Sequence, residues 1–274
     1  MTSDPKVAVL WPFFFSVKGS WSQRMEWLAS AIESQGYRVE RHPRLECCTY
    51  LPEYKGASKA DIVVFNHTDV SKVKGRFPIK AKKTWFFKPT VPDSYHATLD
   101  RLGFGPFSEI TYEKPDYMAV QSDDVDLFFD QEVKGWIEKN SCKWGENHFP
   151  EQEAIPQDLD DFILVIGQML NDEVVNHQAL GGYAHLLWGV IEEARRVSSK
   201  PIVVKMHPKQ AKESPGIHQR VVEGIEKMKL DNVHIFSGYS SIHQFLPQAS
   251  CVITANSGSG YEAMMHDVPI ISFG

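Results

Sequence analysis

The sequence predicts an α/β protein with two domains, each a parallel sheet covered by helices. Three observations support this prediction. The chain has 274 residues, more than one hydrophobic core usually accommodates. Short apolar runs alternate with segments whose apolar residues recur at helical spacing, an order typical of parallel sheets. The alternation fails between residues 141 and 160, where two prolines and several acidic residues occur without periodicity.

The composition argues against several classes of protein. Hydrophobic residues make up 42% and charged residues 23% of the chain, as in ordinary soluble globular proteins. The net charge of −6 argues against a nucleic-acid-binding protein, because such proteins are usually cationic. The four cysteines lack a CxxC spacing, and no signal peptide or apolar run long enough for a membrane span is visible. We therefore expect a cytoplasmic protein with reduced thiols.

The first domain is expected to span residues 1–145. Its one clear helix covers residues 20–37, where apolar residues from Met25 to Ile32 recur at helical spacing and Gly36 provides a stop. Short runs rich in β-branched and aromatic residues predict its strands. These runs are residues 6–11, 37–42, 60–68 and 82–89, with a further possible strand at 116–122.

A linker at residues 146–160 and a second domain at residues 161–274 complete the predicted organisation. Apolar runs predict strands at residues 161–167, 201–208, 232–238, 251–257 and 269–274. Segments between them predict helices at residues 177–199, 216–230, 241–249 and 260–267. Five β units joined by four helices form a doubly wound, Rossmann-like domain.

Small, polar or ionisable residues follow four consecutive strands of the second domain. Ligands of doubly wound sheets bind beyond the carboxyl ends of the strands, so these residues are the candidate binding residues. They are Gly167, Gln168, His207, Pro208, Lys209, Ser237, Tyr239, Ser240, Asn256, Ser257, Gly258, Ser259, Gly260 and Glu262.

Two parts of this set, and Asp172 beside it, have a specific expected chemistry. Residues 256–260 could cradle a phosphate, because glycines allow close approach and N–H groups at a helix start bind anions; an ordinary helix cap is the alternative. His207 and Lys209 could neutralise a leaving phosphate, or lie in a surface loop. Asp172, five residues after Gly167, could be a base, a nucleophile, a ribose ligand or a helix cap.

The first domain offers weaker candidates, expected on the acceptor side of a cleft. They are Ser16, Lys18, Gly19, Arg24, His67 and Lys88. Tyr95, His96 and the loop at residues 102–109 could also bind an acceptor. The histidines are dispersed and form no HExxH or HxxxH pattern, and Asp124 and Asp126 are interpreted as capping a helix. A metal-free reaction is therefore predicted, with no metal site.

The motifs of the second domain resemble those of the bacterial capsule polysaccharide biosynthesis family, which includes the Kdo transferases of capsule and lipopolysaccharide assembly. The segment "SSIHQFLPQASCVITANSGSGYEAMMHDVPIISFG", with "GQMLND" and "KMHPK" before it, carries the resemblance. Their order and spacing agree across residues 161–274, whereas the N-terminal half agrees only in general pattern.

The resemblance implies a GT-B-like fold, with two Rossmann-like domains facing each other across a cleft. It implies a glycosyltransferase that uses a nucleotide sugar, typically CMP-Kdo, as co-substrate, needs no cofactor, and acts on a hydroxyl of a glycan or glycolipid. Asp172 matches the position of the Asp nucleophile through which retaining Kdo transferases are thought to act. His207 and Lys209 would stabilise the departing phosphate.

Several alternatives stay open at this point. Family members usually continue beyond the Phe-Gly at which this sequence ends, so a compact phage-type transferase acting on hydroxymethylated DNA bases is one alternative. A nucleotide-sugar epimerase or hydrolase of the same two-domain type is another. A non-catalytic module that binds a nucleotide sugar or a glycan is a third.

Overall fold

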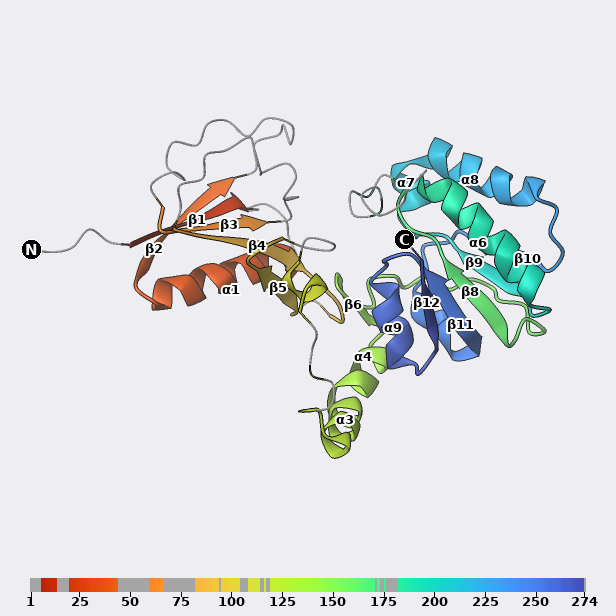
Figure 1. Ribbon diagram of the computed structural model, residues 1–274, viewed down its shortest axis with the longest axis horizontal. Helices are drawn as coiled ribbons and strands as arrows, with labels where there is room; N and C mark the ends of the chain where they lie inside the picture. The colour runs from red at the N-terminus through yellow and green to blue at the C-terminus, as the bar shows by residue number, and fades with distance from the viewer. Residues whose placement is uncertain are drawn as a thin grey trace, which may run out of the picture. The chain divides into compact units, whose positions relative to one another are not determined.

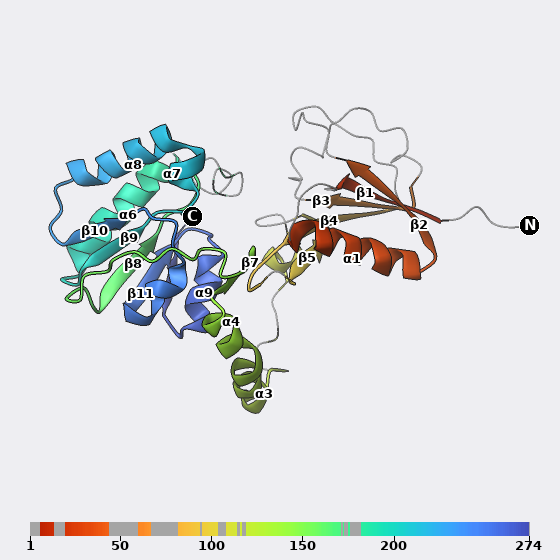
Figure 2. The same ribbon diagram turned by 180° about the vertical axis from the view of Figure 1, so that it is seen from behind.

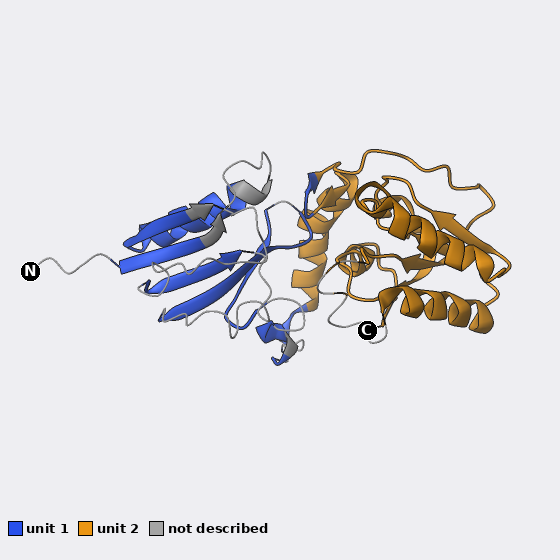
Figure 3. Cartoon of the chain, turned by 90° about the horizontal axis from the view of Figure 1, so that it is seen from above, with its two compact units in different colours: residues 1–121, 143–145 blue, residues 122–142, 146–274 orange. Residues whose placement is uncertain are grey.

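The chain folds into two compact units, each built on one five-stranded sheet. The computed structural model describes residues 6–13, 20–43, 60–66, 82–93, 95–103, 108–113, 116, 119–170, 172, 175 and 182–273. Unit 1 comprises Met1–Gln121 and Lys143–Gly145, and unit 2 comprises Ser122–Cys142 and Glu146–Gly274 (Figure 3).

The sheet of unit 1 has the strand order β2-β1-β3-β4-β5. The first four strands are parallel and β5 runs antiparallel to β4. The strands are β1 (Lys6–Phe13), β2 (Tyr37–Pro43), β3 (Ile62–Asn66), β4 (Lys83–Pro89) and β5 (Ala97–Asp100). A turn of 3-10 helix, η3 (Glu109–Thr111), follows the sheet.

Helix α1 (Ser20–Ser34) lies along one face of this sheet (Figure 1). The helical spacing read from the sequence is confirmed, because Met25 and Ala29 are fully buried. They pack against Leu10 of β1 and Val64 of β3. This spacing gives α1 one apolar side, which is what fixes the helix to the sheet.

The sheet of unit 2 is entirely parallel, with the order β10-β9-β8-β11-β12. This is the doubly wound order that the sequence predicts. The strands are β8 (Phe162–Ile166), β9 (Ile202–Lys205), β10 (Val233–Phe236), β11 (Ala249–Thr254) and β12 (Ile270–Ser272). The α-helices that follow the first strand are α6 (Tyr183–Val197), α7 (Gln210–Glu213), α8 (Pro215–Lys227) and α9 (Ser259–Met265).

Both faces of this sheet are covered, and its strands are mainly apolar. Helices α6 and α8 cover one face, whereas α9 and two turns of 3-10 helix, η6 (Ile242–Gln244) and η7 (Leu246–Gln248), cover the other (Figures 1 and 2). Successive residues of β8 point to opposite faces: Leu164 packs with η7, and Val165 packs with α6. A continuous apolar run is expected of a strand buried in this way.

The segment predicted as a linker packs into unit 2. Leu159 is buried in the same core cluster as Leu164 of β8 and Leu246 of η7, and Ile155 packs against that cluster. Unit 2 also includes residues 122–142, because Val133 and Trp136 pack against Met265 of α9. The boundary between the compact units therefore lies earlier in the chain than the expected domain boundary at residue 145.

Three local predictions differ from the structure. The possible strand at residues 116–122 is wrong, because none of the described residues there belongs to a strand and Ser122 begins α3 (Ser122–Phe128). This helix continues through η5 (Phe129–Val133) and α4 (Lys134–Glu138) to a short hairpin of β6 (Ser141–Cys142) and β7 (Gly145–Glu146). Strand β5 was not predicted, and residues 241–249 form two 3-10 turns instead of one helix. Among the described helices, none combines the length and apolarity that crossing a bilayer requires.

Candidate functional site

Two of the predicted binding residues meet at the topological switch point of unit 2. Strand β8 lies between β9 and β11, and doubly wound sheets bind ligands at the carboxyl ends of the strands where the winding reverses. Gln168 follows β8 and Asn256 follows β11. The Gln168 Nε2 donates to Asn256 Oδ1 at 2.5 Å, and the Asn256 backbone N–H donates to Gln168 Oε1 at 2.9 Å. The two strand ends are thus tied together where a ligand is expected.

The loop after β8 lies close to the end of β9. The Gly167 N–H donates to the Lys205 carbonyl at 2.9 Å. A Cβ at Gly167 would lie only 3.2 Å from the Met206 Cα, so a glycine is what allows the two backbones to approach. The next residue, Gln168, is held by α6, because its backbone N–H donates to the Tyr183 hydroxyl at 3.0 Å.

Tyr183 is a site residue that the sequence analysis missed. Its hydroxyl also donates to the Ile166 carbonyl at 3.3 Å, and burial raises the pKa of this phenol, which keeps it neutral. The position lies at the start of α6 and continues the apolar spacing of that helix. The sequence pattern therefore indicated a core residue and gave no signal for its polar role.

The His-Pro-Lys turn after β9 has a fixed geometry. The Lys209 backbone N–H donates to His207 Nδ1 at 3.1 Å, so a neutral His207 carries its ring proton on Nε2. The next residue, Gln210, is fully buried, and its Oε1 accepts a hydrogen bond from the Leu170 N–H at 2.9 Å. Gln210 therefore connects the turn with Leu170, in the loop after β8. Gln210 was not among the predicted residues, although it directly follows "KMHPK".

A buried ion pair holds the loop after β10. The Lys205 side chain is 3% exposed, and its Nζ lies 3.2 Å from Glu153 Oε2 and 2.7 Å from the Gly238 carbonyl. Glu153 also accepts hydrogen bonds from the Gly238 N–H at 2.6 Å and from the Ser240 hydroxyl. A Cβ at Gly238 would lie 2.6 Å from Glu153 Cδ, so the Glu153 carboxylate can occupy this position only because residue 238 is a glycine. We call residues 150–155, which carry Glu153, the clasp.

In this ion pair, the charge of each residue opposes the effect of burial on the pKa of the other. Burial alone raises the pKa of Glu153, but the Ser240 hydrogen bond and the positive charge of Lys205 outweigh it, and the pKa lies below its usual value. Burial lowers the pKa of Lys205, and the charge of Glu153 opposes that effect. Ser240, expected to contact a ligand, is only 1% exposed and bonds to Glu153 instead.

The turn before α9 bonds largely to itself. The Ser259 N–H donates to Ser257 Oγ at 3.2 Å, and the Gly260 N–H donates to the Ser257 carbonyl at 3.0 Å. The Tyr261 N–H donates to the Gly258 carbonyl at 2.9 Å. The N–H groups of Ser259 and Gly260, both considered for a phosphate cradle, are therefore engaged within the turn itself. Glu262 lies buried in the first turn of α9, at 6% exposure.

The remaining predicted residues of unit 2 lie around this edge. Asp172 is exposed, and its N–H donates to the Met169 carbonyl at 3.0 Å. Ser237 and Pro208 are half-buried. The Tyr239 ring lies 4.9 Å from that of Phe149, with the Lys212 ammonium 5.9 Å from its centre.

The predicted residues of unit 1 have a different outcome. Ser16, Lys18, Gly19 and His67 lie outside the described residues. Lys88 belongs to β4 and is half-buried. Arg24 is only 3% exposed and donates to the carbonyls of Asp93 at 3.1 Å and Lys143 at 2.7 Å. It therefore supports the loop after β4 from within, whereas the sequence analysis expected a cation facing a cleft.

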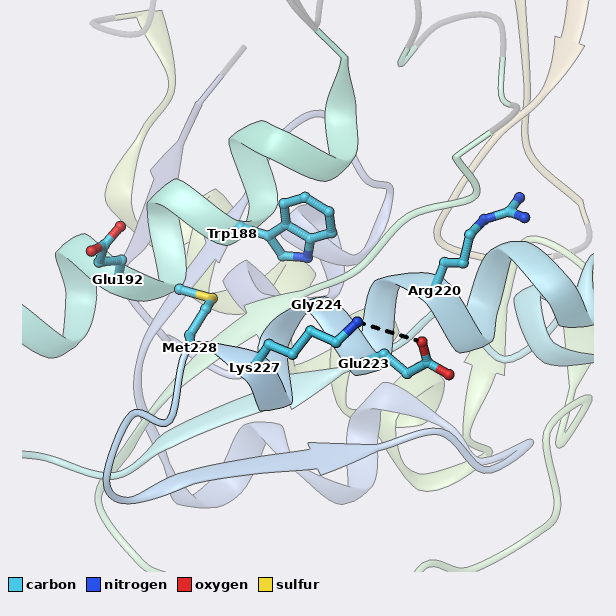
Figure 4. Close-up of a pocket in the computed structure, with 7 residues that line it drawn as sticks. All are labelled: Trp188, Glu192, Arg220, Glu223, Gly224, Lys227 and Met228. Atoms are coloured by element: carbon cyan, nitrogen blue, oxygen red, sulfur yellow. Dashed lines mark ion pairs between the residues drawn. The ribbon is translucent and has the colours of Figure 1, made fainter.

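A cavity of about 500 Å³ lies in the helical layer of unit 2, between α6 and α8 (Figure 4). Its lining contains none of the predicted site residues. It consists of Trp188, Glu192, Arg220, Glu223, Gly224, Lys227 and Met228. Trp188 lies against Gly224, where a Cβ would be 2.4 Å from the indole ring, and its Nε1 donates to the Val221 carbonyl at 3.3 Å. The cavity is lined by residues of α6 and α8 and by Met228. It is therefore not part of the site at the strand ends.

No group of three or more His, Cys, Asp or Glu side chains that could hold a metal ion occurs among the residues that the structure describes. The prediction of a metal-free reaction remains a prediction.

The strand order of unit 2 and the polar residues at its strand ends define a Rossmann-like ligand-binding unit. A second α/β sheet unit precedes it, which makes the fold GT-B-like. The sequence model of the capsule polysaccharide biosynthesis protein family matches residues 111–274, more than half of the chain. The chain belongs to this family.

Two solved structures support the same fold. The beta Kdo 2,4 transferase of Thermosulfurimonas dismutans KpsC is 14% identical, with a TM-score of 0.61, over 98% of this chain and 79% of that chain. The beta Kdo 2,7 transferase of the same KpsC is 14% identical, with a TM-score of 0.52, over 98% and 78% of the two chains. No curated protein matches the chain significantly.

Proposed function

We propose that this chain is a glycosyltransferase that moves a sugar from a nucleotide-sugar donor to a hydroxyl group of a glycan or glycolipid. The observation that carries the proposal is the paired Gln168 and Asn256 at the switch point of unit 2. This pair lies within the residues that match the capsule polysaccharide biosynthesis family. The likeness in fold to two Kdo transferases agrees with it.

The donor is proposed to be CMP-linked and Kdo-like. Support comes from the motifs "GQMLND" and "KMHPK" and from the names of the two structures of similar fold. In unit 2, the residues after β8 and β11 would contact the nucleotide. His207 Nε2 and the Lys209 ammonium would stabilise negative charge on the departing phosphate, since preorganised donors act most strongly where charge develops.

The reaction is proposed to retain the anomeric configuration through Asp172. In the first step the Asp172 carboxylate would form a bond to the anomeric carbon, and the C–O bond to the CMP phosphate would break with its electron pair going to the phosphate. In the second step the acceptor oxygen would bond to that carbon, its proton would pass to water, and the bond to the carboxylate would break with its electron pair returning to Asp172. The exposure of Asp172 near the end of β8 is compatible with such access.

Thermal unfolding with CMP, UDP and GDP tests the donor. At a concentration of 100 times Kd, CMP should stabilise the chain by about 2.7 kcal/mol. Gln168→Leu should abolish this stabilisation, because it removes both bonds to Asn256. Gln219→Leu is the matched control, since Gln219 bonds to Glu223 on the exposed side of α8. Stabilisation by UDP alone would contradict a CMP-linked donor.

Replacing the proposed nucleophile separates chemistry from binding. Asp172→Asn should abolish sugar transfer and leave the shift produced by CMP unchanged. Unchanged turnover would show that Asp172 is not the nucleophile. A wild-type chain that binds CMP and transfers nothing to any acceptor would instead favour the non-catalytic module.

The acceptor is tested by offering a lipid-linked glycan and hydroxymethylated DNA to the same preparation. The family and the fold support a glycan, and neither gives support to DNA. Transfer to the DNA bases in preference to the glycan would overturn the proposed acceptor.

A further inference from the structure

One peptide group in the loop after β8 is held at both of its ends. This group joins Met169 and Leu170. Its N–H, on Leu170, donates to Gln210 Oε1 at 2.9 Å, and its carbonyl, on Met169, accepts the Asp172 N–H at 3.0 Å. Because a peptide group is planar, fixing the direction of its N–H also fixes the direction of its carbonyl. The Gln210 side chain therefore orients the carbonyl to which the Asp172 backbone bonds.

Gln210 is itself held by the turn after β9. Its backbone N–H donates to the His207 carbonyl at 2.9 Å, and its side chain is fully buried. The Leu170 N–H can only donate, so the side-chain oxygen of Gln210 must face it, which fixes the orientation of the amide. One residue thus joins the turn that carries His207 and Lys209 to the loop that carries Asp172.

The nitrogen of the same amide is not satisfied. Gln210 Nε2 is buried and has no hydrogen-bond partner in the part of the chain that the structure describes. An unpaired buried donor lowers the stability of a fold, which an apolar side chain of the same length would not do. Groups that are retained at such a cost are characteristic of functional sites. The bond from Gln210 Oε1 to the loop after β8 is the contact that a function would require.

We propose that Gln210 is a positioning residue, which through this peptide group holds the Asp172 backbone in a fixed place relative to the His207–Lys209 turn. The inference rests on the proposed function, in which Asp172 attacks the anomeric carbon and the turn stabilises the departing phosphate. The two act on the same carbon and its leaving oxygen, so their spacing must be kept closely. A displacement of about 1 Å can lower a rate about a hundredfold. Gln210 itself touches no reacting atom.

Sugar-transfer kinetics of Gln210→Met test the inference. Methionine has a similar length, but its thioether is a weak acceptor for the Leu170 N–H. Since only the alignment of the transition state is lost, kcat and kcat/KM for the donor should fall together, about tenfold to a hundredfold. Stabilisation by CMP and the unfolding midpoint should stay close to those of the wild type, because the variant also removes the unpaired nitrogen. A merely structural role would lower both.

A conservative variant and a matched control accompany this experiment. Gln210→Glu should recover most of the rate, since a carboxyl oxygen can accept the same N–H. Gln244→Met removes a glutamine whose Oε1 accepts the Glu153 N–H at 3.1 Å in the same unit, and it should leave kcat unchanged. Should Gln210→Met fail to fold, Gln210→Asn takes its place, because the shorter side chain withdraws the oxygen by about 1.5 Å.

Hydrogen exchange of the backbone amides tests the contact without any reaction. The Leu170 and Asp172 amides should exchange about fivefold faster or more in Gln210→Met, and Gln244→Met should not change them. Equal exchange in Gln210→Met and the wild type, or an equal kcat, would overturn the inference. A wild-type chain that transfers no sugar would contradict the proposed function, whereas the exchange of Asp172 shows separately whether Gln210 holds the loop.

Discussion

The two units use the carboxyl ends of their strands in different ways. In unit 2 the polar side chains at the strand ends bond to one another or to Glu153 of the clasp, and Gln168, Lys205 and Ser240 are all less than a tenth exposed. In unit 1 the described loop after β4 buries Asp93 and exposes Tyr95 and His96. A preorganised edge suits a ligand of constant structure, such as a nucleotide, because little reorganisation is needed on binding. An exposed aromatic surface accommodates more varied ligands, such as the ends of different glycans.

The largest effect should follow from removing the buried lysine of unit 2. Lys205→Met leaves the Glu153 carboxylate without its cation, and breaking a buried pair in this way should lower the free energy of unfolding by about 3 kcal/mol. Urea unfolding measures the loss, and hydrogen exchange should place it in β9 and β10. Lys227→Met, at an exposed ion pair of the same unit, should change it by less than about 0.5 kcal/mol. Equal losses would remove the distinction between the buried edge and the surface.

The corresponding change in unit 1 should have a smaller effect. Arg24→Met removes charged donors from the carbonyls of Asp93 and Lys143, which should cost about 2 kcal/mol. Hydrogen exchange should increase in β4 and β5. Arg101→Met, at an exposed ion pair with Glu109, is the control and should be nearly neutral. A loss larger than that of Lys205→Met would reverse the order of the two units.

A glycine pair in helix α8 tests packing at the outer layer of unit 2. Gly224→Ala places a Cβ 2.4 Å from the Trp188 ring and should destabilise the chain by about 1–2 kcal/mol. Gly216→Ala in the same helix meets nothing within 4 Å and should stabilise it by about 0.5 kcal/mol. Thermal unfolding of the two variants should therefore shift in opposite directions. Shifts of the same sign would show that Trp188 moves freely.

The last prediction concerns pH and a histidine pair of unit 2. His243 Nδ1 lies 2.8 Å from His266 Nε2, and burial together with His243 lowers the pKa of His266 to about 4. The unfolded chain takes up this proton near pH 6.5, so the stability due to neutral His266 is complete above pH 6.5. It should decrease as the pH falls from 6.5 towards 4. His266→Gln should flatten the urea midpoint over this range, and His234→Gln should not.

The helices and strands that could be predicted are those determined by residues close together in the sequence. The spacing of Met25 and Ala29 gave α1, and the apolar runs gave four strands of unit 1 and all five of unit 2. Gln168 and Asn256 were each predicted because each follows a strand. That they bond to each other depends on β11 lying beside β8, which is a property of the strand order.

The residues that were missed, or whose position differs from the prediction, are those whose contacts lie far away in the sequence. Glu153 stands in an aperiodic segment, and its bonds to Gly238 and Ser240 join residues 85 and 87 positions apart. Arg24 follows the pattern of an exposed cation on a helix. Its burial is decided by carbonyls 69 and 119 positions away, which no local pattern contains.

The clasp also determines how much of the chain unit 2 needs in order to fold by itself. Its partners lie on β9 and beyond β10, so the contacts can form only after those strands have assembled, and the loop that they close is long. A fragment starting at residue 161 would bury the Lys205 ammonium without its counter-ion. The smallest fragment that should refold to the native sheet begins ahead of the clasp, and a start at residue 122 would also keep Trp136 on α9.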